Sequence, residues 1–568
     1  MPSVLDQRMD AAMAAVVADE GMLPLASIPR YGRALPVIAA APPTLGAYFA
    51  HFAGEHAHAT FLVAGDERLT FAEVHAAATG VAHALVARGV VKGDRVGIAM
   101  RNSPSWIALY MGIVMAGGIA TLLNGWWQTE ELSAALNEVA CDMVFADPPR
   151  AKRLASLEDA HCAVIEIDDA RPLAAALRPL GTGDAATAMP AITPDDLATI
   201  LFTSGSTGPS KGALSDHRGV VQAIFNYLAQ VMTMVGIATQ DGNPPMGQPS
   251  TLLNVPLFHV TAEIPVMLQS FAMGRKLVLM AKWDAEEAMR LIEKEGITYF
   301  VGVPLMSFEL LTHPNRAKYD LSTVADFAAG GAPRPAEHVR RIAEEMAGPD
   351  GKGGAPLIGY GLTETNAIGT SNWRSNYIAK PNSAGRPSLP LVDLAILDDA
   401  GRPVAQGQRG EIAIRSICNF REYWGRPDAT AAAMTADGYF LTGDIGYLDE
   451  DGYVFIVDRK KDIIIRGGEN ISCQEVEAAL YEHPDVAEAA VFGLADERLG
   501  EVPGAVVVPR DGAVLTAEGL AGFLHAHIAA FKVPQTIWIT HAPLPRLGTE
   551  KIDKVRVRAT YRALAVVG

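Results

Sequence analysis

A stretch rich in Ser, Thr and Gly near residue 200 is the clearest chemical signal in the chain. Residues 201–212 read LFTSGSTGPSKG, after an apolar run over 198–202 that predicts a strand. Small residues let successive backbone N–H groups converge on phosphate oxygens, and Lys211 adds a cation. The pattern is not a Walker A loop, because Ser210 and Gly212 flank the lysine. It predicts a phosphate-binding loop, with a flexible linker as the structural alternative.

Further motifs follow this loop along the chain. They are PLFH at 256–259, GGAP at 330–333, GYGLTET at 359–365, TGD at 442–444, DRKKD at 458–462, GGENI at 467–471 and PRLGTEKIDK at 545–554. In this order and spacing, the set resembles the adenylate-forming (AMP-binding) superfamily, in its acyl-CoA synthetase and fatty-acid–CoA ligase branch. The resemblance runs from about residue 45 to 560, so it covers nearly the whole chain.

The resemblance implies an ATP-dependent acyl-CoA synthetase, with ATP, Mg²⁺ and the co-substrate coenzyme A. A carboxylic acid and ATP would give an acyl-adenylate and pyrophosphate, and acyl transfer to coenzyme A would give acyl-CoA and AMP. The ATP-binding positions that it implies are Thr203, Ser204, Gly205, Ser206, Thr207, Gly208, Lys211, Gly330, Gly331, Ala332, Tyr360, Gly361, Thr363, Asp444 and Arg459.

Three residues match catalytic positions of the family. Lys551 corresponds to the lysine that bridges the carboxylate and the α-phosphate, and His259 to the histidine beside the acyl carboxylate. Glu364 follows an apolar strand and offers hard oxygen ligands suited to Mg²⁺. Without the resemblance, Lys551 would more often be a surface charge, His259 a core histidine and Glu364 a helix cap.

The resemblance also implies movement of the C-terminal part. Lys461 matches the hinge position, and Gly467 and Gly468 leave room for a pantetheine arm in a coenzyme A tunnel. The alternative for the charged run at 459–461 is a solvated loop.

Other functions share these motifs. The runner-up is a stand-alone adenylation enzyme that loads a carrier protein, and a luciferase-like oxygenase is a third reading. A catalytically inactive nucleotide-binding protein is the fourth, for which Glu550 in place of the usual Gly before Lys551 is the one sequence hint.

The acid itself is not identified by the sequence. Its pocket is expected after His259, over 301–308 and over 330–365, where Thr261, Met306 and Phe308 indicate an apolar wall. Fatty, aryl, alicyclic and steroid-derived acids all fit that description.

The pattern of elements predicts an α/β fold, with a large N-terminal domain of layered sheets and helices and a small, mobile α+β C-terminal domain. A strand over 276–280, a helix from Asp284 to Gly296 and a strand over 297–303 form a parallel crossover unit. Near Asp458 a loop rich in charged residues precedes a new pattern of helices and strands. This change predicts two domains, 1–458 and 459–568. In the second part, Ser472 caps a helix to about residue 482, before strands near 486–492 and 505–508.

The amino-acid composition indicates which classes of partner and which cellular compartment to expect. The net charge of -17 disfavours nucleic acid as a partner, and four cysteines without a CxxC pair indicate a reducing cytoplasm. The uncharged stretch 103–128 is predicted to be a buried helix (105–115) and a strand (119–123) separated by two glycines, so no transmembrane segment is expected. A homodimer is left open.

Overall fold

The computed structural model describes residues 2–157, 162–181, 188–203, 210–347, 353–467, 469–547 and 551–567. Their contacts divide the chain into two compact units. The first contains Met1–Thr203, Ser210–Leu394 and Ile414–Phe440, and the second contains chiefly Ala395–Ala413 and Leu441–Gly568.

The largest sheet of the first unit has nine strands. In spatial order they are β17 (Arg386–Pro387), β16 (Gly369–Trp373), β15 (Ala355–Gly361), β14 (Asp326–Gly330), β13 (Tyr299–Gly302), β11 (Ser250–Leu253), β12 (Lys276–Leu279), β3 (Thr60–Ala64) and β4 (Glu67–Thr70). The run from β15 to β3 is parallel. Parallel neighbours bring their carboxyl ends to one edge, where binding residues collect in open α/β sheets.

The predicted crossover unit is confirmed within this sheet. Asp284 accepts a hydrogen bond from the Glu287 N–H, helix α11 (Ala285–Glu295) follows, and Gly296 ends it at a φ of 59°. Strands β12 and β13 both run parallel to β11, which lies between them.

A seven-stranded sheet forms the other half of the first unit. Its order is β20 (Glu422–Tyr423), β10 (Gly212–Asp216), β9 (Leu197–Phe202), β6 (Ile119–Leu122), β5 (Arg95–Ala99), β7 (Met143–Ala146) and β8 (Ala163–Glu166). The buried helix predicted before β6 is α4 (Pro104–Met115), so the interpretation of the uncharged stretch as a helix and a strand is confirmed.

One helix in the described residues is long and apolar enough to cross a membrane by length and composition. This is α8 (His217–Gln240), and 67% of its most apolar window is buried inside the protein. Polar residues such as Gln222 and Asn226 are buried along it as well, as in a core helix.

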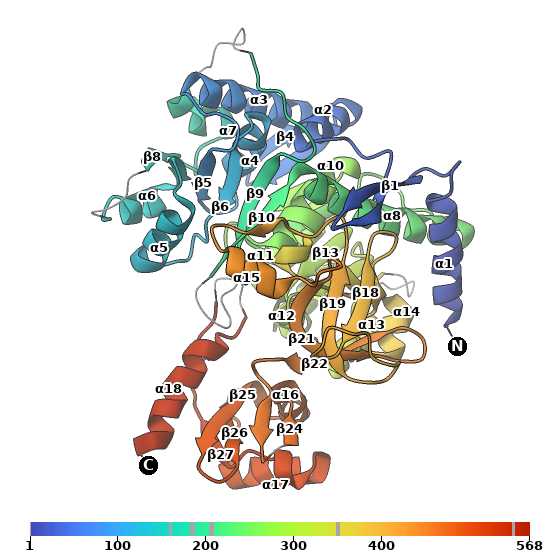
Figure 1. Cartoon of the computed structure of the whole chain (residues 1–568), viewed down its shortest axis with the longest axis vertical. Helices are drawn as coiled ribbons and strands as arrows, with labels where there is room; N and C mark the ends of the chain where they lie inside the picture. Colours follow the sequence, from blue (N-terminus) through green and yellow to red (C-terminus); the bar gives the residue numbers. More distant parts are fainter. Residues whose placement is uncertain are drawn as a thin grey trace. The chain divides into compact units, whose positions relative to one another are not determined.

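The first unit also contains a two-stranded sheet and further α-helices, several of which are labelled in Figure 1. They are α1 (Val4–Val16), β1 (Leu25–Arg30), β2 (Arg33–Ile38), α2 (Leu45–Glu55), α3 (Phe71–Ala87), α5 (Thr129–Val139), α6 (Pro148–Leu154), α7 (Leu173–Ala176), α9 (Val260–Ala262), α10 (Gln269–Ala272), α12 (Pro304–Thr312), α13 (Ala336–Glu345), α14 (Arg374–Ala379) and α15 (Pro427–Ala433).

The second unit holds two smaller sheets. One has the order β18 (Asp393–Leu397), β19 (Gly410–Arg415), β21 (Phe440–Leu448), β22 (Val454–Arg459). The other contains β24 (Glu469–Ile471), β23 (Ile464–Arg466), β26 (Gly500–Pro509), β25 (Val486–Asp496) and β27 (Thr536–Ile539), with helices α16 (Cys473–Tyr481), α17 (Ala517–His527) and α18 (Lys554–Val567).

The predicted cap and strands of the C-terminal part are confirmed. Ser472 accepts a hydrogen bond from the Glu475 N–H at the start of α16, and β25 and β26 cover the two predicted strands. The predicted domain boundary at Asp458 stays a prediction, because the two compact units have other bounds.

Candidate active site

The two ends of the predicted phosphate loop are joined by hydrogen bonds. The loop connects β9 to the antiparallel β10, and Thr203 donates its N–H to the Lys211 carbonyl at 2.9 Å. Lys211 returns its own N–H to Thr203 Oγ1 at 3.2 Å. Both residues therefore have fixed backbones. Ser204, Gly205, Ser206, Thr207 and Gly208 lie outside the described residues.

Glu364 lies on a short 3₁₀ turn, Thr363–Thr365, directly after β15. It is 8% exposed, and Oε1 accepts a hydrogen bond of 2.6 Å from the Tyr423 hydroxyl. Its carbonyl accepts the Phe420 N–H at 2.8 Å. The carboxylate therefore stands where the nine-stranded sheet meets β20, the edge strand of the seven-stranded sheet.

The turn after Glu364 has a strained backbone. Asn366 and Ala367 have φ values of 49° and 65°, a region that non-glycine residues seldom adopt. The Asn366 side chain accepts from Ser215 Oγ at 3.2 Å and donates to the Cys418 carbonyl at 2.8 Å. A Cβ added at Gly361 would lie 2.1 Å from the Ala367 carbonyl oxygen, so Gly361 makes this close approach possible.

Two segments that contain predicted ATP-binding positions lie at the ends of adjacent strands. Gly330 ends β14 and is paired with Gly359 of β15, one residue before Tyr360. Gly331 has a φ of 78°, which favours glycine. The structure thus brings the 330–332 and 359–361 segments to one edge of the sheet, as parallel pairing predicts.

His259 begins the short helix α9, and its Nδ1 accepts the Thr261 N–H at 3.3 Å. A six-residue π-helix, Glu263–Leu268, follows at once. Glu263 is fully buried, accepts a hydrogen bond from the Tyr110 hydroxyl at 2.7 Å, and has its pKa raised by burial to about 8. Sequence reasoning missed this carboxyl, although a Glu inside an apolar run was a visible signal.

Two residues expected in the apolar wall of the acid pocket, Met306 and Phe308, each contact a polar side chain. Met306 is buried, and its sulfur accepts a hydrogen bond from Asn254 Nδ2 at 3.2 Å. Phe308 stacks on His338, with ring centroids 4.3 Å apart.

In the second unit, three predicted site residues lie close together. Asp444 on β21 is 3% exposed, and its Oδ1 pairs with Arg459 Nε at 2.8 Å across the β21–β22 ladder. Lys551 is near both side chains. Desolvation, with a smaller contribution from Arg459, lowers the pKa of Lys551 to about 8, while Asp444 opposes this shift. A carboxylate acceptor, a guanidinium and a lysine thus share one small region.

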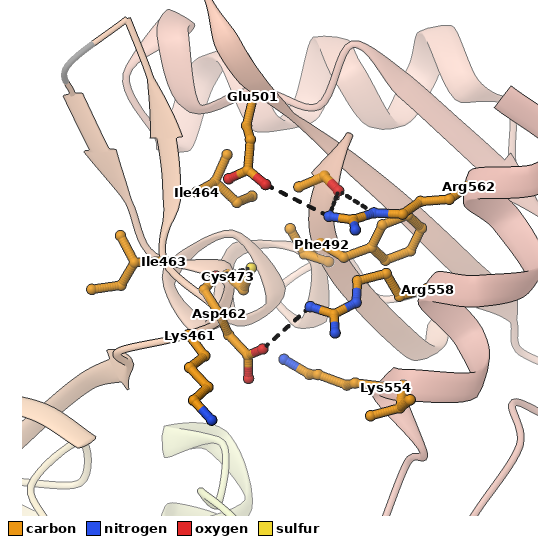
Figure 2. Close-up of a pocket in the computed structure, with 13 residues that line it drawn as sticks. Lys461, Asp462, Ile463, Ile464, Cys473, Phe492, Glu501, Lys554, Arg558 and Arg562 are labelled. Atoms are coloured by element: carbon orange, nitrogen blue, oxygen red, sulfur yellow. Dashed lines mark hydrogen bonds and ion pairs between the residues drawn. The ribbon is translucent and has the colours of Figure 1, made fainter. Parts of the chain in front are cut away.

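Lys461 lies in the exposed turn after β22, beside a pocket of the second unit. Figure 2 shows Lys461 and Asp462 on one side of this pocket and the α18 side chains on the other. Arg558 of α18 is paired with Asp462 at 3.9 Å. The helix that follows Lys551 is therefore tied to the residue next to the predicted hinge.

Gly467 occupies the turn between β23 and β24 with a φ of 59°, and its N–H donates to the Leu499 carbonyl at 2.7 Å. A Cβ there would lie 3.1 Å from a Leu499 methyl carbon. The tight turn accounts for this glycine, and its neighbour Gly468 lies outside the described residues.

The chemistry of Glu364 fits a magnesium ion. Within the part of the chain that the structure describes, no three His, Cys, Asp or Glu side chains are grouped to hold a metal. Mg²⁺ is commonly held by one or two carboxylates together with substrate phosphates and water. A single buried carboxylate such as Glu364 matches that mode of binding.

Comparison with known proteins agrees with this arrangement. Residues 49–424 match the AMP-binding enzyme family, and 475–551 match the AMP-binding enzyme C-terminal domain. A feruloyl-CoA synthase of Amycolatopsis sp is 34% identical over 507 residues, which are 89% of this chain and 96% of the relative. A long-chain-fatty-acid–CoA ligase of Bacillus subtilis is 32% identical, over 86% and 90% of the two chains.

A solved structure gives the same fold. ATP-bound MatB from Rhodopseudomonas palustris is 28% identical with a TM-score of 0.79, and the match covers 92% of this chain and 99% of that one. The chain therefore belongs to the AMP-binding enzymes, in the family of AMP-forming acid–thiol ligases.

Proposed function

We propose that this chain activates a carboxylic acid with ATP and transfers the acyl group to coenzyme A. The observation that carries the proposal is the grouping of Asp444, Arg459 and Lys551 in the second unit. Adenylate formation requires a group that holds the ribose and a cation that stabilises the phosphoryl oxygens. A carboxylate can accept hydrogen bonds from both ribose hydroxyls, and a lysine can supply the cation. Relatives named as CoA ligases over nearly their whole lengths support the same assignment.

In the proposed first step, a carboxylate oxygen of the acid attacks the α-phosphorus of ATP in line. The bond between the α-phosphorus and its bridging oxygen breaks, and pyrophosphate leaves with the electron pair. Negative charge spreads over the phosphoryl oxygens, so preorganised cations stabilise the transition state. Lys551 and Lys211 supply two of these cations, and Glu364 would hold Mg²⁺, which neutralises phosphate charge when bound.

In the second step, the thiol sulfur of coenzyme A attacks the acyl carbon of the mixed anhydride. The bond from the acyl carbon to the phosphate oxygen breaks, AMP leaves, and the thiol proton is lost to solvent. Gly467 and Gly468 are proposed to border the path of the pantetheine arm, and His259 to lie beside the acyl group.

A panel of acids tests this proposal directly. The protein is incubated with ATP, Mg²⁺ and coenzyme A together with long-chain fatty, hydroxycinnamic, alicyclic and steroid-derived acids. Pyrophosphate and a CoA thioester are expected in equal amounts with at least one class. Pyrophosphate release without any thioester would favour loading of a carrier protein, and no pyrophosphate with any acid would exclude ATP-dependent activation of the acids in the panel.

Asp444→Ala is expected to raise the KM for ATP by about 10²-fold, because two hydrogen bonds to a charged acceptor are lost. The KM for coenzyme A should change by less than about threefold. Asp444→Asn keeps the size of the side chain and one acceptor oxygen. Its KM for ATP should lie between those of the wild type and Asp444→Ala. Asp444 also pairs with Arg459, so its removal can lower the stability of the protein. The thermal midpoints of the variants and the wild type are therefore compared first. An unchanged KM for ATP would make this turn structural only.

The four cysteines are free thiols in the described structure, and three of them are buried. We propose a reducing, cytoplasmic setting on this ground. A soluble fraction that retains activity without detergent would agree with that setting.

A further inference from the structure

The aromatic ring of Tyr423 lies between two residues of the proposed ATP site. Its hydroxyl donates to Glu364 Oε1 at 2.6 Å, and the Lys211 ammonium lies over its ring, 4.5 Å from the centroid. These three residues are far apart in the sequence and come from β20, the turn after β15, and the base of the phosphate loop. One tyrosine thus contacts both the proposed metal ligand and the proposed phosphate-binding cation.

The ring is held firmly by its surroundings. Tyr423 is 5% exposed and packs in a small core with Ala213, Phe420 and Phe440. Strand β20 pairs with β10, in which Ala213 stands opposite Tyr423. The Tyr423 N–H donates to Thr430 Oγ1 at 2.9 Å. A side chain in such packing has one orientation, so its hydroxyl and ring face are fixed in space.

The chemistry of both contacts favours a positioning role. The phenol is the only donor in its contact with the Glu364 carboxylate, which can only accept, so the hydrogen bond runs from Tyr423 to Glu364. A hydrogen bond to a carboxylate fixes the direction in which its lone pairs point. The electron-rich ring face attracts the Lys211 ammonium and limits where it can move.

We propose that Tyr423 is a positioning residue for nucleotide activation, which orients the Glu364 carboxylate toward the metal–phosphate group and holds Lys211 over its ring. The inference rests on the proposed function. It predicts that the hydroxyl matters for the adenylation step and for its dependence on Mg²⁺, and that it has little effect on acyl transfer.

Tyr423→Phe isolates the hydroxyl, because it retains the ring under Lys211. The Mg²⁺ concentration for half-maximal pyrophosphate release should rise about 10-fold and kcat for adenylation should fall about 10-fold, as expected when a hydrogen bond to a charged group is lost. Thioester formation from supplied acyl-adenylate should change by less than about twofold. An unchanged Mg²⁺ dependence, or an equal loss in both half-reactions, would overturn the proposal.

The chain offers a matched control. The Tyr439 hydroxyl donates to Asp393 Oδ2 at 3.0 Å, and Arg415 lies over its ring at 4.3 Å, so the same two contacts occur outside the proposed site. Tyr439→Phe should leave the Mg²⁺ dependence unchanged. If it shifts that dependence as strongly as Tyr423→Phe, the effect is general to the fold and the proposal fails.

A double-mutant cycle checks that Tyr423 acts through Glu364. In the Glu364→Gln background, Tyr423→Phe should change adenylation by less than about twofold, whereas full additivity would contradict the proposal. All variants are assayed about 10 °C below the lowest thermal midpoint, which removes differences in folding.

Failure of this inference can be told apart from failure of the proposed function. A wild-type protein that releases pyrophosphate, with a Tyr423→Phe variant of unchanged Mg²⁺ dependence, refutes the positioning role alone. A wild-type protein inactive with every acid refutes the function. Binding of a fluorescent ATP analogue, titrated with MgCl₂ in both proteins, then still tests whether the hydroxyl matters.

Discussion

Lys551→Ala is expected to lower pyrophosphate release by about 10²- to 10³-fold or more, while thioester formation from a supplied acyl-adenylate stays largely intact. The reason is that negative charge on the α-phosphoryl oxygens develops only in the first step, and removal of one preorganised charge partner typically costs that much. The two half-reactions are measured separately, as pyrophosphate with acid and ATP, and as thioester with synthetic adenylate and coenzyme A. Equal losses in both would refute the assigned role.

The lowered pKa of Lys551 adds a second observable to the same experiment. The ammonium form is the one that stabilises the transition state, and it is lost as the pH rises through about 8 in the free enzyme. The kcat/KM for adenylation, which reports free-enzyme pKa values, should therefore fall above about pH 8. Lys551→Arg keeps its charge across this range, so whatever activity it retains should not fall there. A decline at the same pH in that variant would assign the titration to another group.

Lys461→Pro is expected to keep adenylation and to lower thioester formation by about 10²-fold or more. Proline fixes φ near about -65°, which should trap one orientation of the C-terminal part. Lys551 and the turn at Gly467 both lie beyond Lys461, and each is proposed to serve a different half-reaction. A misplaced reacting group typically costs a factor of this size.

The surroundings of Lys461 define what a rotation there must break. The Ser472 hydroxyl donates to the Val457 carbonyl at 2.7 Å, and the Gln474 N–H donates to Asp458 Oδ2 at 3.2 Å. These bonds join the end of β22 to the start of α16, across the predicted hinge. A rotation at Lys461 would have to open both hydrogen bonds.

A control variant separates the backbone effect from loss of the lysine side chain. Lys461→Ala removes the ammonium and keeps a freely rotating backbone, so both half-reactions should remain within about threefold of the wild type. Domain alternation about this residue is refuted if Lys461→Pro slows the two steps equally, or if its thioester step survives.

Local signals predicted the elements well where capping groups define the ends. Asp284 and Gly296 bracket α11, and Ser472 begins α16, because these side chains and this glycine satisfy terminal backbone groups within the same stretch of sequence. Two glycines separated α4 from β6 for the same local reason. The order of motifs likewise predicted the family, and the matches over most of the chain confirm it.

Other features had no local signal. Glu263, in the π-helix after His259, accepts its hydrogen bond from the hydroxyl of Tyr110, which is 153 residues away in the sequence. The strained turn at Asn366 depends on Ser215 and Cys418, which belong to other parts of the fold. Propensity and periodicity describe one segment at a time, so they do not predict which distant side chain will satisfy a given polar group.

The sequence by itself determined the chemistry available to this protein: a Ser/Thr/Gly loop for phosphate, carboxylates at Glu364 and Asp444, and a lysine at 551. Those properties belong to residue types and their spacing. Only the tertiary structure decided which of them meet. The contact of Tyr423 with Lys211 and Glu364 arises because β20 pairs with β10 at the edge where the turn after β15 arrives. Likewise, Lys551 has its lowered pKa because the fold partly desolvates it and places the Arg459 charge nearby, and both are properties of the packed chain.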